Sequence, residues 1–154
     1  MEKIEFEIIT LNWEKADYKD LPSTSGLYQI YGTSPLYGMD TLLYIGKASN
    51  LNTRIKDHFE FRDAMIGRQP NKSCRYTTLD STLLDIAEQI LIVMHKPSFN
   101  SARLIQLSEP VRAKPYYIQN HGDRGMLNIE NTNFYFLDKT IDVVIPPDIQ
   151  LDIR

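Results

Sequence analysis

Cysteine is almost absent from this chain. Cys74 is the one cysteine in 154 residues. A single thiol can form no internal disulfide and is not a metal site by itself, so neither a disulfide-stapled secreted fold nor a cysteine-based zinc site is expected. We interpret Cys74 as a small buried apolar residue and expect a cytoplasmic protein.

Long apolar runs are also missing. No segment reaches the roughly 20 apolar residues that a transmembrane helix needs, so no membrane partner is expected. Residues 1–7 alternate charged and apolar side chains, which is not the pattern of a signal peptide. The length corresponds to one domain, and a composition of 42% hydrophobic and 24% charged residues is ordinary for a globular protein.

The chain has no overall excess of positive charge. Its formal net charge is −3 and its pI is about 5.6, which argues against a protein that simply coats nucleic acid, because phosphate neutralisation drives such binding. The basic residues are nevertheless concentrated. Residues 47–75 hold seven Lys or Arg against three acids (7 − 3 = +4), whereas residues 1–46 hold three against seven (3 − 7 = −4). A basic segment alone usually indicates a solvated helix surface.

Apolar periodicity and turn residues predict an α/β chain of the α+β type. The outline is a small core of strands and helices, followed by a β-rich C-terminal extension. The predicted organisation is an N-terminal arm (1–24), a core (25–102) and an extension (103–154). Strands are predicted over 2–10, 26–32, 41–48 and 74–79, helices over 50–66 and 81–96, and short strands over 115–119, 126–130 and 133–138. Asn50 or Ser49 is expected to cap the first helix.

Basic side chains are predicted to converge at one end of the sheet. Arg54 and His58 are four residues apart in the first predicted helix and therefore share one face. Lys47 leads from a strand into the same helix. Cations so placed suit a phosphate whose developing charge they stabilise. The alternative is a solvated helix face with a chance histidine.

Glu88 lies at the edge of the apolar arc of the second predicted helix. A carboxylate beside apolar neighbours is unfavourable unless it is paired or bound to a cation. A lone carboxylate suits Mg²⁺, which keeps most of its waters. The alternative is a boundary glutamate that reaches water. The fully polar face of this helix is assigned to Asp85, Gln89 and Lys96.

Two tyrosines, Tyr28 and Tyr44, lie on neighbouring predicted strands. Tyr28 and Ile30 share one face of their strand, and Leu27 and Tyr31 share the other. Strand aromatics usually pack in the core. A phenol titrates near pH 10 and acts as a base only where nearby cations lower its pKa.

Taken in chain order, these segments resemble the GIY-YIG nuclease family. The resemblance covers about residues 25–101 and five separated segments. It differs in Leu27, where the family name has isoleucine, and in a longer loop over residues 33–40. The matching segments are Gly26-Leu27-Tyr28, Tyr44-Ile45-Gly46-Lys47, Asn50-Leu51 with Arg54 and His58-Phe59, Ala87-Glu88 with Leu91-Ile92, and Lys96-Pro97 with Phe99-Asn100.

The resemblance implies a compact α/β core around a small three-stranded sheet flanked by helices. It also implies a metal-dependent endonuclease that hydrolyses DNA phosphodiester bonds with a single Mg²⁺, or Mn²⁺ in its place. Tyr28 matches the tyrosine that helps to orient or deprotonate the attacking water, and Tyr44 matches a second tyrosine, a neighbour in the same network. Arg54 matches the arginine that steadies the phosphate, His58 a candidate general base, and Glu88 the metal ligand. Three further positions are assigned to substrate binding. Gly46 matches a glycine that allows close backbone approach, Lys47 a position that is often basic, and Asn100 an asparagine that is either structural or borders the site.

Other readings of the same pattern remain open. The chain is compatible with a non-catalytic module that binds nucleic acid or protein on the same fold, and with a nuclease that acts on RNA. A decayed enzyme is expected to have lost part of the polar set, and none is lost here. A homodimer or larger complex is compatible with the sequence. The aromatic and basic residues of the extension predict either DNA contacts or packing.

Overall fold

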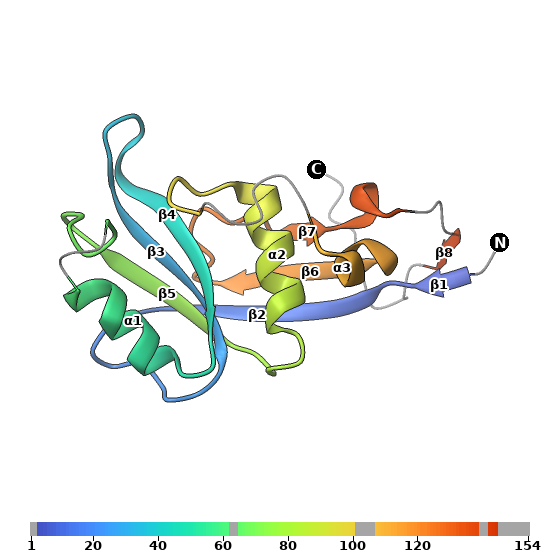
Figure 1. Cartoon of the computed structure of the whole chain (residues 1–154), viewed down its shortest axis with the longest axis horizontal. Helices are drawn as coiled ribbons and strands as arrows, with labels where there is room; N and C mark the ends of the chain where they lie inside the picture. The colour runs from blue at the N-terminus through green and yellow to red at the C-terminus, as the bar shows by residue number, and fades with distance from the viewer. Residues whose placement is uncertain (1–2, 62–64, 101–106, 139–141, 145–154) are drawn as a thin grey trace.

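The computed structural model describes residues 3–61, 65–100, 107–138 and 142–144. Its main feature is a six-stranded sheet in the order β4-β3-β5-β2-β6-β7 (Figure 1). Two short strands, β1 (Lys3–Glu5) and β8 (Asp142–Val144), form a separate parallel pair. The six strands are β2 (Glu7–Ala16), β3 (Gly26–Ser34), β4 (Gly38–Ala48), β5 (Ser73–Thr78), β6 (Tyr116–Gly122) and β7 (Glu130–Thr132).

The α+β class is confirmed, but the prediction of a three-stranded sheet is wrong. The three expected strands form one half of the sheet, where β3 pairs antiparallel with both β4 and β5. Strand β2 extends the sheet beyond β5, and its two ends pair with different strands. Residues 14–16 pair antiparallel with β5, and residues 7–13 pair parallel with β6. The segment expected to be an arm therefore contains an interior strand that joins the C-terminal strands to the rest.

Two long helices and two short helical turns accompany the sheet. They are α1 (Leu51–Glu60), α2 (Leu84–His95), α3 (Glu109–Ala113) and the 3₁₀ turn η1 (Phe134–Phe136). Of the two candidate caps, Asn50 caps α1, because its side chain accepts a hydrogen bond from the Thr53 N–H at 3.1 Å. Helix α1 ends at Glu60, earlier than predicted.

Two of the short C-terminal strands were predicted wrongly. No strand covers residues 126–129, and β7 begins at Glu130. Residues 134–136 form η1 instead of a strand. Asn133 explains the change, since its side chain bonds the backbone of Tyr116 and Lys114, at 2.8 Å each, and so replaces a strand ladder.

The alternation along β3 divides the core between the two faces of the sheet, as predicted. Leu27 and Tyr31 belong to the cluster that contains the apolar side of α2. Tyr28 and Ile30 belong to the cluster that contains Leu51 of α1, together with Ile55 and Cys74. The side chain of Cys74 is fully buried, as expected. Tyr28 therefore faces α1.

The C-terminal strands are fixed to β2 by a buried amide. Trp13 Nε1 donates to Asn120 Oδ1 at 3.0 Å, and Asn120 Nδ2 donates to Asn131 Oδ1 at 2.8 Å. Tyr116 and Tyr117 are buried on the same strand, which supports packing for these two aromatics, while Tyr135 is exposed. Among the described helices, none has the length and apolar composition needed to cross a membrane.

Candidate active site

Three rings from three elements meet on the face of the sheet that α1 covers. Tyr28 comes from β3, Tyr44 from β4 and His58 from α1. The Tyr28 hydroxyl lies 2.8 Å from His58 Nε2. The ring centroids of Tyr28 and Tyr44 are 6.0 Å apart, and those of Tyr44 and His58 are 5.2 Å apart. Tyr28 is buried, whereas Tyr44 and His58 remain partly open to solvent.

Gly46 allows this close packing. It is the direct cross-strand partner of Tyr28. A Cβ placed on Gly46 would overlap the ring and hydroxyl of Tyr28 and the ring edge of Tyr44. Any side chain at this position would push both phenols out of place. The close approach expected at Gly46 is therefore an approach of rings to the backbone.

The Tyr28–His58 pair is neutral at pH 7. Burial raises the pKa of Tyr28 far above its ordinary value, and the nearby Tyr44 and Glu88 raise it further, while Arg54 opposes the rise. Burial also lowers the pKa of His58 to about 4; the charge of Arg54 adds to this lowering, and Asp57 opposes it. In the tautomer that carries the imidazole proton on Nδ1, the protonated phenol donates to Nε2.

The lowered His58 pKa predicts that acid destabilises the fold. The unfolded imidazole takes up a proton near its ordinary pKa of 6.5, whereas the folded one does so only near about 4. The free energy of unfolding is therefore at its full value above pH 6.5, and it falls as the pH drops toward 4. We expect a loss of about 1 to 2 kcal/mol, after allowance for the part of the ring that water reaches.

Urea unfolding of the wild type and of His58→Gln at several pH values measures this loss. The wild type should lose more stability than His58→Gln between pH 7 and pH 4. Parallel profiles for the two proteins would contradict the lowered pKa.

Arg54 brings a cation to the two phenols. The Tyr28 phenol is the largest cause of a raised pKa at the Arg54 guanidinium, and Tyr44 contributes in the same direction. Arg54 and Lys47 also line one pocket of about 330 Å³ where β4 passes into α1. Both residues thus border one pocket, while His58 is not among the residues that line it.

Glu88 belongs to α2, and its side chain is half-buried. Its charge contributes to the raised pKa of Tyr28, so the carboxylate is within electrostatic reach of the phenol. Within the described part of the chain, no three His, Cys, Asp or Glu side chains gather where they could hold a metal. A metal here would rest on one carboxylate. That donor set fits Mg²⁺, which binds through one or two carboxylates and substrate phosphate, and not structural Zn²⁺.

The side chain of Asn100 bonds the backbone of β4. Its Oδ1 accepts from the Ile45 N–H at 2.9 Å, and its Nδ2 donates to the Ile45 carbonyl at 2.8 Å. Phe99 N–H also bonds the Leu43 carbonyl at 2.9 Å. The segment after α2 is thereby attached to the free edge of β4. Because both polar groups of the buried Asn100 amide bond Ile45, the structure shows Asn100 holding β4, in line with the structural role that the sequence left open.

One polar residue was placed wrongly by the sequence. Gln89 was assigned to the polar face of the second helix, yet its side chain is fully buried. It bonds Asp85 of the same helix and the backbone of Ser108. Helical periodicity could not predict the burial of Gln89, because the segment that covers it, at Ser108, comes later in the chain.

Residues 25–100 match the GIY-YIG catalytic domain family, and through this segment the chain belongs to that family. The chain is similar to UvrABC system protein C of Helicobacter hepaticus, with 35% identity over 94 residues. It is 36% identical over 95 residues to UvrABC system protein C of Helicobacter pylori strain J99. These matches cover 53% of this chain but only 14% and 15% of the relatives.

Among solved structures, the fold is similar to the GIY-YIG N-terminal endonuclease domain of UvrC from Thermotoga maritima bound to magnesium. The identity is 23% and the TM-score 0.40, over 54% of this chain and 90% of that domain.

Proposed function

We propose that this protein is an endonuclease that hydrolyses phosphodiester bonds of DNA with the help of one divalent cation. The observation that carries the proposal is the neutral Tyr28–His58 pair, 2.8 Å apart, beside Arg54 and within the electrostatic reach of Glu88. Membership in the GIY-YIG family supports it. Tyr44 completes the ring cluster, and Gly46 gives both phenols room.

In the proposed reaction, His58 is the final acceptor of the proton of the attacking water. The raised pKa of Tyr28 makes the phenol a poor base on its own. Its hydroxyl instead passes a proton on, accepting one from water while donating its own to His58 Nε2. The water oxygen forms the new bond to phosphorus, and the bond from phosphorus to the 3′ oxygen breaks. The departing oxygen takes up a proton from solvent, and the product strand begins with a 5′ phosphate.

Arg54 has two roles in this proposal. Its guanidinium stabilises the charge that develops on the phosphoryl oxygens. It also depresses the His58 pKa in the free protein. A phosphate bound against Arg54 counters that positive charge, so the His58 pKa rises when substrate binds. The base is thereby strengthened when it is needed.

Glu88 is the residue that would hold the cation. When bound, Mg²⁺, or Mn²⁺ in its place, supplies positive charge that stabilises the leaving 3′ oxygen. The role of Glu88 would then be to hold that charge at α2.

The rest of the chain supports this centre. We propose that residues 25–102 form the catalytic unit. Residues 103–154 pack against it or contact substrate, and β2 links the two. One chain offers one such centre, so a double-strand break requires a homodimer, a larger complex or two encounters. A reduced, fully buried Cys74 agrees with the cytoplasmic location that we include in the proposal.

A substrate panel tests the proposed function. Supercoiled plasmid, single-stranded DNA and RNA are incubated with the protein in Mg²⁺, in Mn²⁺ and in chelator. We expect metal-dependent cutting of DNA. Preferential cutting of RNA would show that the substrate is RNA and not DNA. Binding without cutting in any metal would indicate a non-catalytic binding module.

A further inference from the structure

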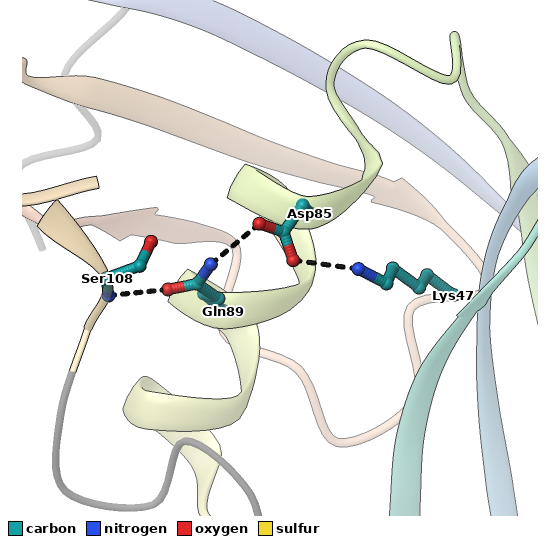
Figure 2. Close-up of polar contacts among 4 residues, drawn as sticks. All are labelled: Lys47, Asp85, Gln89 and Ser108. Atoms are coloured by element: carbon teal, nitrogen blue, oxygen red, sulfur yellow. Dashed lines mark hydrogen bonds and ion pairs between the residues drawn. The ribbon is translucent and has the colours of Figure 1, made fainter. Parts of the chain in front are cut away.

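A chain of polar contacts runs from β4 to Ser108, the residue that precedes α3 (Figure 2). Lys47 Nζ donates to Asp85 Oδ1 at 2.8 Å. Gln89 Nε2 donates to the other carboxylate oxygen, Oδ2, at 2.9 Å. Gln89 Oε1 in turn accepts from the backbone N–H of Ser108 at 2.8 Å. Three segments that are distant in sequence are thus joined by three successive bonds.

This arrangement differs from an ordinary surface ion pair. Exposed pairs are usually mobile and contribute little. Here the carboxylate of Asp85 is held at both oxygens, and its partner Gln89 is fully buried. The backbone of Ser108 fixes the far end of Gln89. Asp85 also lies in the first turn of α2, where the helix dipole stabilises a negative charge. The Lys47 ammonium group is therefore held against a fixed acceptor.

Lys47 also lines the pocket that Arg54 lines. We propose that Asp85 is a positioning residue, held by Gln89 and Ser108, that places the Lys47 ammonium at this pocket to receive a phosphate of the DNA strand. An ammonium group has three donors, so the bond to Asp85 does not exclude a phosphate. This inference rests on the proposed nuclease function. It adds that residues from Ser108 onward stabilise the substrate contact.

The test compares two variants with a matched control. Asp85→Asn removes the carboxylate charge that holds Lys47. Ser108→Pro removes the N–H that holds Gln89, and the Ser108 φ of −69° suits proline, while the lost side chain makes no capping bond. The control is Asp138→Asn, which loses a carboxylate that is similarly exposed (50% against 57%) and is paired with Arg112 at 3.6 Å. Melting temperatures check that every variant is folded.

The expected result is a loss of substrate affinity that depends on Lys47. Asp85→Asn should lower kcat/KM for plasmid cleavage by about tenfold, mainly through KM, and Ser108→Pro by about threefold. For a short duplex in chelator, the slope of log Kd against log salt should fall by about 1 in Asp85→Asn, as for one lost phosphate contact. In a Lys47→Met background, Asp85→Asn should have no further effect. Asp138→Asn should match the wild type.

A measurement without nucleic acid separates this inference from the proposed function. Nitrogen-15 NMR of the Lys47 ammonium should show slower hydrogen exchange in the wild type than in Asp85→Asn or Ser108→Pro. If the ammonium is held but Asp85→Asn binds and cuts as the wild type does, the positioning role is overturned and the nuclease stands. An additive effect of Asp85→Asn in the Lys47→Met background also overturns it. If the wild type cuts no nucleic acid, both proposals fail.

Discussion

Glu88→Gln is expected to reduce Mg²⁺-dependent DNA cleavage by about a thousandfold or more. The change keeps the size of the side chain and removes its charge. Without the carboxylate, no other described cluster could hold the cation. A bound cation contributes several kcal/mol to stabilising the charged transition state, and about 4 kcal/mol corresponds to a factor of a thousand in rate.

Single-turnover cleavage of plasmid at increasing Mg²⁺ measures this effect. The variant should remain slow at all metal concentrations, while its melting temperature stays near that of the wild type. Glu109→Gln is the matched control, because it removes an exposed carboxylate from α3. A Glu88→Gln protein that cuts within about tenfold of the wild type would exclude Glu88 as the metal ligand.

Arg54→Met is expected to have the second largest effect, a fall in kcat of about 100- to 1,000-fold. This is the range for losing one preorganised charge-stabilising donor. The variant should also change His58. Since the charge of Arg54 is the second cause of the low His58 pKa, that pKa should rise above about 4 when the charge is removed. Arg54→Lys should keep the charge but lose the planar fork, with an intermediate rate.

An NMR titration of His58, carried out beside the rate measurement, distinguishes this role from a structural one. The matched control is Lys56→Met, which removes one positive charge from the same helix. It should leave the His58 titration close to that of the wild type. A slow Arg54→Met protein with an unchanged His58 titration would show that Arg54 does not act on the base. An Arg54→Met protein that cleaves as fast as the wild type would show that Arg54 takes no part in the reaction.

The parts of the site that follow from local periodicity could be predicted from the sequence. The spacing of Arg54 and His58 placed both on α1, and the alternation in β3 placed Tyr28 opposite Leu27. Both inferences need only the repeat of a helix or a strand. The cap at Asn50 likewise depends on its immediate neighbours.

What the sequence did not predict depends on contacts between distant segments. Strand β2 joins the two halves of the sheet through pairings about 60 and 110 residues apart, and alternation within a strand says nothing about its partners. Gln89 has the polarity of a surface residue but is covered by the segment at Ser108. The Asn133 amide, bonded to Tyr116 and Lys114, replaces the strand expected over 133–138 with a turn. In each case a tertiary bond outweighs a local preference.

The most direct test of the central claim is the cutting of supercoiled plasmid by the wild-type protein in Mg²⁺ and in chelator, with the new ends labelled. The account predicts nicks in Mg²⁺ that carry a 5′ phosphate, and intact plasmid in chelator. Cutting that persists in chelator, or ends that carry a 3′ phosphate, would contradict it.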